Sequence, residues 1–389
     1  MRQSCLAFLL LAFFAIPVQG QGSRDVDLTE PDGTKLRATY YAAAKPGPGV
    51  LLLHQCNRER KIWHELAGSL SAAGLHVMTL DYRGYGESGG ERFEDFQQMQ
   101  PVVREKWPSD VDAAFTYLTA QPGVDKERIG AGGASCGVNQ SIQWARRHSE
   151  VASLVLLSGG TTTDGRKFLQ HTPVPIFVSA SEDDGGVVAL MRWLQGFSRN
   201  PQNKFVQYKK AGHGTDMFVV EGELPGLIVQ WFETTLRTAP AKLEAAASGP
   251  RASASEEFWA VVEQPGNGAK AAKAYEEAKK RDPSLFLFPE SALNDLGYER
   301  LGSGHVKDAI EIFKLNVAEY PGSANVYDSL SDAYLADGQA ELARHYAEKA
   351  LQKLEADKSL GGEFRALLQK SIEQKLQTLA KTGTAIKPQ

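Results

Sequence analysis

The chain has 389 residues, of which 42% are hydrophobic and 23% are charged, and its formal net charge is −4. This length suggests two domains, and the hydrophobic content is that of a globular protein that can bury a substantial core. The slightly negative charge argues against nucleic acid as the main partner, and no cluster of lysine or arginine marks an anionic membrane surface.

The first residues have the pattern of a secretory signal peptide. Arg2 supplies a positive charge, Leu6–Ile16 is an apolar run, and Pro17 precedes small residues that end at Gly20. A membrane-spanning helix needs about 20 apolar residues, so this run is too short to insert permanently. We expect residues 1–20 to be removed and the mature protein to be exported, either periplasmic or secreted.

From residue 21 to 238, short apolar runs alternate with amphipathic stretches. The expected strands are Asp25–Leu28, Lys35–Tyr41, Gly49–His54, His76–Tyr82, Arg128–Gly133, Ser153–Ser158, Val174–Ser181 and Lys204–Gly212. The first two flank a Pro-Asp-Gly-Thr turn, as in a hairpin, and most of the others are continuous apolar runs typical of parallel strands covered on both faces. Because the connections have helical periodicity, the pattern predicts an α/β domain with a mainly parallel sheet wrapped by helices.

A strand-to-helix turn in this domain contains a candidate nucleophile. Residues 133–137, Gly-Ala-Ser-Cys-Gly, follow an expected strand and precede a helical stretch, which is the context of a Gly-x-Ser-x-Gly nucleophile elbow. The turn is so tight that the positions two residues from the nucleophile need glycine, whereas Cys136 has Ala134 and Val138 at those positions. The pattern therefore favours Ser135, and a glycine-rich turn without chemistry is the alternative.

A serine hydroxyl needs a base to take its proton and an acid to orient that base. The elbow architecture predicts the chain order serine, acid, histidine. His213 fits this order, since it lies in a glycine-flanked loop just past the last expected strand. The acid is expected just after the preceding strand, where Asp184 is the first choice and Asp183 the second.

Two backbone N–H groups are expected to stabilise the oxyanion that develops during acyl transfer. One belongs to Cys136, directly after the nucleophile, and the other to the loop after the third strand, where Cys56 is the first choice and Gln55 the second. Cys5 is expected to leave with the signal peptide. The two cysteines that remain are these two candidate donors, so both are expected beside one pocket. They form either a disulfide or two small apolar side chains packed under the site, and we favour the packed side chains.

Several of these motifs resemble the α/β-hydrolase superfamily and, within it, the dienelactone-hydrolase-like branch. The resemblance spans about Leu36 to Leu236 and rests on residues 133–137, Leu80–Gly90, Asp110–Gly130 and Ala211–Gly214. It implies a serine hydrolase that uses no metal or organic cofactor, with Ser135, Asp184 and His213 as its catalytic triad. It also implies that Asp81 and Arg83 stabilise the loop after the fourth strand.

The chain departs from this branch in the loop after the third strand, where His54 is followed by Gln55 and the usual residue is glycine. In addition, Gly159–Pro173 is too short to form a lid domain, so we expect an open site unless Gly90–Trp107 covers it. The aromatic residues Phe93, Phe96 and Trp107 are expected to pack rather than to contact substrate.

Composition changes at residues 239–256, where Ala, Ser, Pro and Gly dominate as in a flexible linker. Residues 257–380 then have helical spacing with a 34-residue period, in which Leu296, Leu301, Gly304 and Ala309 recur as Leu330, Leu335, Gly338 and Ala343. This period resembles tetratricopeptide repeats (TPR), with a degenerate first hairpin and a capping helix at Leu360–Leu379. Such arrays bind protein or peptide partners; a docking platform for the catalytic domain and a dimer contact are the alternatives.

Together these features predict an exported serine hydrolase that cleaves small-molecule carboxylic esters. Ser135 attacks the carbonyl, His213 accepts and returns the proton, and Asp184 orients the imidazole. A serine peptidase on the same fold is the neighbouring alternative, because a triad does not distinguish an ester from an amide. A non-catalytic protein that binds its partner through the repeats is the alternative from a different class.

Overall fold

The computed structural model describes residues 22–93, 96–238, 253–357 and 362–383. The predicted signal peptide lies outside these residues, and so do residues 239–252 of the predicted linker. The last helix before this gap ends at Thr238, and the first helix after it begins at Ala254. The helical domain therefore begins three residues before its predicted start at residue 257.

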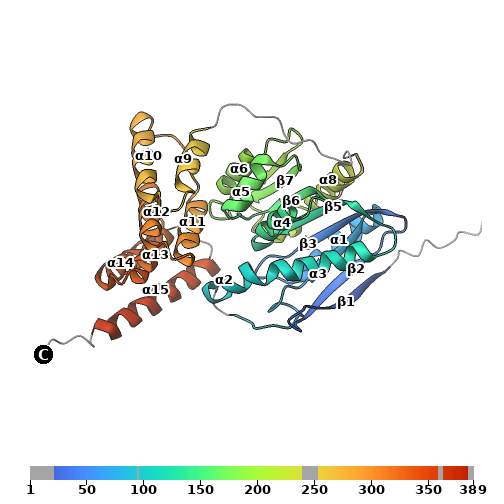
Figure 1. Cartoon of the computed structure of the whole chain (residues 1–389), viewed down its shortest axis with the longest axis horizontal. Helices are drawn as coiled ribbons and strands as arrows, with labels where there is room; N and C mark the ends of the chain where they lie inside the picture. Colours follow the sequence, from blue (N-terminus) through green and yellow to red (C-terminus); the bar gives the residue numbers. More distant parts are fainter. Residues whose placement is uncertain (1–21, 94–95, 239–252, 358–361, 384–389) are drawn as a thin grey trace, which may run out of the picture.

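An eight-stranded sheet forms the centre of the first domain (Figure 1). Its strands are β1 (Ser23–Thr29), β2 (Lys35–Tyr41), β3 (Gly47–Leu53), β4 (His76–Leu80), β5 (Val124–Ala134), β6 (Val151–Leu157), β7 (Ile176–Ser181) and β8 (Lys204–Tyr208). They lie in the order β1-β2-β4-β3-β5-β6-β7-β8. β2 is antiparallel to both of its neighbours, and every other pair is parallel. The predicted mainly parallel sheet is confirmed.

Helices cover both faces of this sheet. They are η1 (Arg60–Trp63), α1 (His64–Ala72), α2 (Phe96–Glu105), α3 (Trp107–Ala120), α4 (Cys136–Arg147), α5 (Thr163–His171), α6 (Val187–Phe197), η2 (Gly214–Asp216), α7 (Met217–Val220) and α8 (Leu224–Thr238). In β3, Leu51 and Leu53 share an apolar cluster with α3, α4 and α6, whereas Val50 and Leu52 share one with α1 and α8. Because successive side chains of a strand point to opposite faces, burial on both sides requires the continuous apolar run seen in the sequence.

Trp107, the first residue of α3, packs in the core as the sequence predicts. Trp107 is fully buried, and its ring stacks on Tyr82 with a centroid distance of 3.9 Å. Phe93 is half-buried and packs against the same apolar cluster. The side chain of Phe96 is not among those that the structure describes.

The second domain is all-helical, as predicted. Its helices are α9 (Ala254–Val262), α10 (Gly268–Arg281), α11 (Glu290–Gly302), α12 (Val306–Glu319), α13 (Ala324–Ala336), α14 (Ala340–Ala356) and α15 (Gly362–Gly383). α13 begins at residue 324, which is 34 residues after the start of α11 at 290, and α14 at 340 follows α12 at 306 by the same interval. The helix pairs thus keep the period of the sequence, while their membership of the TPR family stays a prediction.

The helical domain packs on α5 and α6 of the first domain. Trp259 of α9 lies against Trp193 of α6, with ring centroids 4.8 Å apart. The buried Arg166 of α5 places its guanidinium 4.2 Å from the centre of the Trp259 ring and pairs with Glu263 at 3.0 Å. The tryptophans belong to one apolar cluster that runs through both domains. This face of the helices therefore serves as a docking surface for the chain's own first domain.

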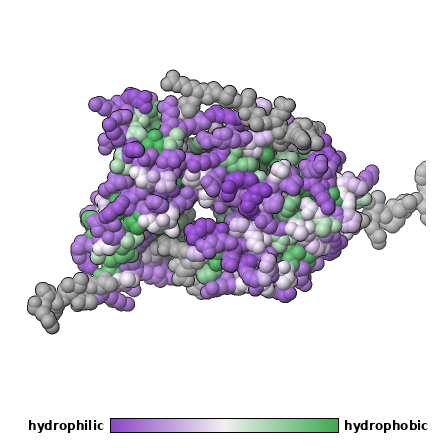
Figure 2. Space-filling view, viewed as in Figure 1, coloured by the Kyte–Doolittle hydropathy of each residue, from purple (hydrophilic) through white to green (hydrophobic). Residues whose placement is uncertain are grey.

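Hydrophilic residues cover most of the face of the molecule in Figure 2. Exposed large apolar side chains include Phe286 and Leu367 in the helical domain and Val219 in the first domain. None of the helices in the described ranges is long and apolar enough to cross a membrane.

The shared cluster predicts that Trp259→Ala destabilises the protein. Truncation of a fully buried tryptophan leaves a cavity, so the free energy of unfolding should fall by about 3–5 kcal/mol in urea denaturation. Phe286→Ala is the matched control, because Phe286 is 47% exposed whereas Trp259 is 1% exposed. Equal denaturation midpoints for the two variants would contradict a core that includes both domains.

Candidate active site

Ser135 lies on a sharp turn between β5 and α4, at the carboxyl edge of the sheet. Its φ of 52° and ψ of −119° are a conformation that non-glycine residues rarely adopt. A side chain at Gly133 would overlap the backbone of Gly137, and a side chain at Gly137 would overlap the backbone of Leu53. These two glycines therefore allow the turn that raises the half-buried Ser135 above the strands.

The histidine and the acid come from the loops after β8 and β7, at the same edge of the sheet. Nδ1 of His213 lies 2.7 Å from Oδ2 of Asp184. Gly214, the next residue after His213, packs against Ala134, the residue before Ser135. The histidine loop thus contacts the nucleophile turn. In the described part of the chain no hydrogen bond joins the Ser135 hydroxyl to His213; such bonds often form only with substrate present.

Asp183 has a different set of partners. Its carboxylate accepts a hydrogen bond from the Ser181 hydroxyl and others from the backbone N–H groups of Ala211 (3.3 Å) and Gly212 (3.2 Å). The Ser181 hydrogen bond lowers the pKa of this carboxyl. Asp183 therefore holds the chain that leads to His213, while Asp184 contacts the imidazole.

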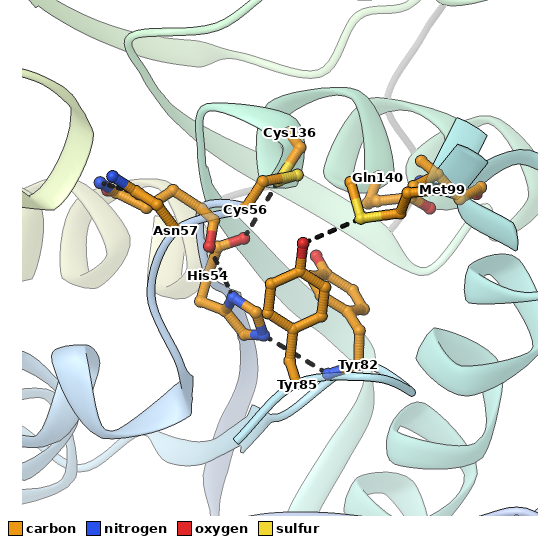
Figure 3. Close-up of a disulfide and its surroundings, with 10 residues drawn as sticks. His54, Cys56, Asn57, Tyr82, Tyr85, Met99, Cys136 and Gln140 are labelled. Atoms are coloured by element: carbon orange, nitrogen blue, oxygen red, sulfur yellow. Dashed lines mark hydrogen bonds between the residues drawn. A yellow bond between two sulfur atoms is a disulfide. The ribbon is translucent and has the colours of Figure 1, made fainter. Parts of the chain in front are cut away.

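The two candidate oxyanion donors are joined by a disulfide. Cys56 lies in the loop after β3 and Cys136 begins α4, with their Cα atoms 5.8 Å apart (Figure 3). The expectation of two packed, unbonded cysteines is therefore wrong. The side-chain-free Gly137 allows the elbow to pack directly on the backbone at the end of β3, which brings the two cysteines into bonding range.

The backbone N–H groups of Cys56 and Cys136 have no hydrogen-bond acceptor within the described ranges, and neither has that of Gln55, the second candidate donor. For Cys136 this follows from its place in the first turn of α4, where N–H groups lack intrahelical partners. Unpaired N–H groups at the edge that holds Ser135 are what an oxyanion site needs.

Gln55 has a role that the sequence did not indicate. Its buried side-chain carbonyl Oε1 accepts hydrogen bonds from the backbone N–H (2.9 Å) and the hydroxyl (2.8 Å) of Thr215, and its Nε2 donates to Asn57. Next to it, Nη2 of Arg58 donates to both carboxylate oxygens of Asp216, at 3.0 and 3.1 Å. Both contacts fix the loop after β3 to the segment after His213. The signal available in the sequence was Gln55 itself, a large amide at a position where the dienelactone-hydrolase-like branch usually has glycine.

His54 fixes the other side of the same loop. Its Nδ1 donates to the Gln55 carbonyl at 2.8 Å, and its Nε2 accepts from the backbone N–H of Tyr82 at 3.4 Å. Burial lowers the pKa of His54 to about 4, so the imidazole is neutral at pH 7. The ring also packs against Tyr82 and Tyr85 (Figure 3).

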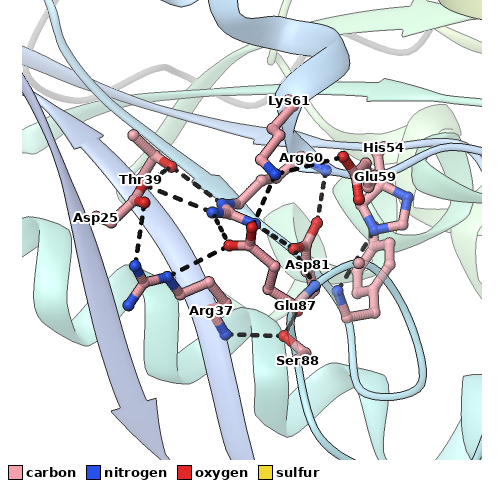
Figure 4. Close-up of polar contacts among 12 residues, drawn as sticks. Asp25, Arg37, Thr39, His54, Glu59, Arg60, Lys61, Asp81, Glu87 and Ser88 are labelled. Carbon is pink, nitrogen blue, oxygen red and sulfur yellow. Dashed lines mark hydrogen bonds and ion pairs between the residues drawn. The ribbon is translucent and has the colours of Figure 1, made fainter.

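Buried ion pairs hold the loop after β4, in agreement with the implied role of Asp81 and Arg83. Figure 4 shows the contacts of Asp81. The Asp81 carboxylate accepts from the backbone N–H of Arg60 at 2.6 Å and pairs with the Arg60 guanidinium. It also accepts from the backbone N–H of Glu87 at 3.0 Å. Arg83 pairs with the buried Asp110 at 2.7 Å. These contacts hold the loop in place, and none of them involves Ser135.

An open groove of about 820 Å³ lies beside the disulfide, lined by Cys56, Arg58, Ile62, Tyr85, Phe93, Met99 and Val102 among others. Helix α2 forms one wall, so the segment before α3 borders the groove without closing it. The three predicted triad residues do not line this groove. The groove adjoins Cys56, one of the two candidate oxyanion donors.

The disulfide predicts a simple result in thiol titration. The mature protein, denatured without reductant, should release no thiol that reacts with Ellman's reagent, because its two cysteines are bonded. After reduction two thiols should appear. Two reactive thiols before reduction would contradict the bond.

Asp81→Asn should lower the free energy of unfolding by about 3 kcal/mol, because it removes the buried partner of the Arg60 charge and leaves only the more exposed Glu87 and Asp25. Asp25→Asn is the control. Asp25 also contacts Arg37 and Arg60, but it is 44% exposed in its side chain, and exposed pairs contribute about 1 kcal/mol or less. Both free energies of unfolding are measured by urea denaturation. A similar decrease in the two variants would contradict a larger contribution from the buried Asp81–Arg60 pair than from the exposed Asp25 contacts.

Comparisons with known proteins agree with this fold. Residues 44–180 match the family model described as serine aminopeptidase, S33. A thiohydrolase from Aspergillus aculeatus is 35% identical over 112 residues, which is 28% of this chain and 33% of the thiohydrolase. The chain spans less than half the length of the first curated relatives that it matches.

Among solved structures, an esterase from Pyrococcus furiosus has 18% sequence identity and a TM-score of 0.46, covering 55% of this chain and 91% of the esterase. A dienelactone hydrolase from Anabaena variabilis has 19% identity and a TM-score of 0.44, covering 56% of this chain and all of the hydrolase. The strand order and the single antiparallel strand β2 are consistent with an α/β-hydrolase fold, and the matched family model covers residues 44–180 of the first domain.

Proposed function

We propose that the protein is an exported serine hydrolase that cleaves carboxylic esters of small molecules through an acyl-enzyme. The observation that carries this proposal is the 2.7 Å contact between His213 and Asp184, at the sheet edge that also holds Ser135. A carboxylate on Nδ1 holds the imidazole in the tautomer whose Nε2 can accept a proton. Fold alone would not support a reaction class, whereas this arrangement of groups does.

In the proposed reaction the Ser135 hydroxyl attacks the ester carbonyl while Nε2 of His213 takes its proton. The carbonyl oxygen becomes an oxyanion, which the N–H groups of Cys56 and Cys136 stabilise. His213 then gives the proton to the leaving alcohol, and an acyl group remains on Ser135. A water molecule, activated by the same imidazole, releases the acid and restores the enzyme.

The groove beside Cys56 supports an acyl group with an apolar part. Ile62, Phe93, Met99 and Val102 line it, and so do several charged residues, Arg58 and Arg83 among them. The thiohydrolase among the relatives adds thioesters as a substrate class to test, since a thioester presents the same carbonyl to the nucleophile.

A serine peptidase is the second candidate, and the description of the matching family model as a serine aminopeptidase favours it. The two candidates differ only in the leaving group, an alcohol or an amine. We further propose that the face of the TPR-like helices that does not dock on α5 and α6 binds a protein or peptide segment.

A fluorophosphonate probe tests the nucleophile. The purified protein should be labelled, and Ser135→Ala should abolish the label. Activity on p-nitrophenyl esters of increasing chain length, on matched thioesters and on peptide anilides then separates esterase from peptidase. We expect esters and thioesters to be cleaved with kcat/KM at least about tenfold above the anilides. Absence of labelling in the native protein would favour a binding protein instead.

The neighbouring aspartates provide a matched pair for the acid. Asp184→Asn should reduce kcat by about 10⁴-fold, the effect of losing the orienting carboxylate of a triad. Asp183→Asn removes the same charge one residue away but leaves the imidazole contact intact, so its loss in kcat should be far smaller. Equal losses in the two variants would contradict the assignment of Asp184.

A further inference from the structure

We propose that the Cys56–Cys136 disulfide positions the two oxyanion donors, so that the hydrolase is fully active only when this bond is oxidised. The inference rests on the proposed function, because it assigns the bond a role in that site. The cysteine side chains themselves do not touch the reacting atoms in this proposal. They act through the backbone N–H groups of the same residues.

The bond joins the two segments whose separation the oxyanion site depends on. Cys56 and Cys136 are 80 residues apart in sequence and lie in different elements, the loop after β3 and the first turn of α4. Both carry N–H groups without an acceptor in the described chain. A transition-state oxygen needs both donors at about 2.7–3.1 Å, so a shift of either segment weakens the stabilisation.

The other directed contacts of the loop after β3 join it to segments other than α4. Gln55 and Arg58 bind the segment after His213, and His54 binds the loop after β4. In the described chain the loop and α4 also meet where Gly137 packs on the backbone of Leu53 and His54, and where the Cys136 sulfur lies 3.8 Å from the His54 carbonyl oxygen. Reduction therefore leaves the fold in place and loosens the spacing of the two donors.

The disulfide is also within reach of a reductant. Cys56 and Cys136 are half-buried, and Cys56 lines the open groove. A thiolate of a small dithiol can attack the Cys56 sulfur, which breaks the protein disulfide and releases the Cys136 thiolate. The second thiol of the reductant then displaces the Cys56 thiolate. Two electrons pass to the protein, both cysteine thiolates take up a proton, and the dithiol becomes a cyclic disulfide.

The test compares the oxidised protein, the protein reduced with dithiothreitol and a Cys56→Ala/Cys136→Ala double variant. Alanine keeps both backbone N–H groups, so any loss of activity comes from their position. Steady-state kinetics on a p-nitrophenyl ester are combined with the Ki of a matching trifluoromethyl ketone, whose adduct with serine carries an oxyanion. Far-UV circular dichroism and thermal denaturation report whether the fold persists.

We expect kcat to fall at least about tenfold in the reduced protein and in the double variant, with KM changed less than about twofold. The Ki of the ketone should rise by the factor lost in kcat/KM, because both depend on the oxyanion donors. The double variant should not respond to dithiothreitol. A merely structural bond would instead change the melting temperature and leave kcat and Ki of the folded protein unchanged.

Full kcat in the folded, reduced protein would overturn the inference while leaving the proposed function intact. So would a loss of activity that follows the loss of ellipticity. If the oxidised protein neither reacts with the fluorophosphonate nor cleaves the ester, the proposed function fails, and the inference fails with it.

Discussion

The arrangement of the candidate site depends on the five-residue loop after β3, residues 54–58. Three other segments are fixed to it by directed contacts. His54 binds the loop after β4, Gln55 binds the histidine loop through Thr215, and Cys56 is bonded to the start of α4. Since the candidate nucleophile, the candidate base and one candidate oxyanion donor lie on different segments, their relative positions are set where these segments meet. In this protein they meet on a single short loop.

The loop in turn needs an uncharged histidine. Neutral His54 donates at Nδ1 and accepts at Nε2, so it joins the loops after β3 and β4 with both ring nitrogens. A protonated imidazole has no acceptor nitrogen, and burial disfavours its charge, which lowers the pKa of His54 to about 4. The Asp81–Arg60 pair supports the same junction on the other side, because Arg60 lies just after the loop and Asp81 just after β4. The hydrogen bonds of neutral His54 and the buried Asp81–Arg60 ion pair therefore both hold the loop after β3 against the loop after β4.

The helical domain has a physical connection to this edge. It packs on α6, and α6 begins at Val187, three residues after Asp184. It also contacts α5 through Arg166, whose guanidinium lies between the Trp259 ring and Glu263. The helices thus cover the elements that follow β6 and β7, where a separate lid could not be built from fifteen residues. The loop that carries the candidate acid therefore leads into a helix whose buried face packs in the apolar cluster shared by the two domains.

The sequence predicted those features that depend on local pattern. Continuous apolar runs located the strands because both faces of the sheet are covered, and glycine spacing located the turn at Ser135 because the turn leaves no room for side chains. Groups from distant segments could be brought together only from motif order and spacing, which preferred Asp184 to Asp183 without showing the contact with His213. The choice between Asp183 and Asp184 depends on which carboxylate points toward His213, a matter of side-chain direction within one loop.

The disulfide is the clearest case of this limit. The motif positions placed Cys56 and Cys136 at one pocket, yet whether two such residues bond depends on a Cα separation and on the direction of their side chains. Gly137 contributes to the short separation, because only a residue without a side chain lets the elbow rest on the backbone at the end of β3. The glycine that the nucleophile turn requires is therefore also the glycine that brings the two sulfur atoms together. The geometry of the turn and the formation of the bond are parts of one constraint.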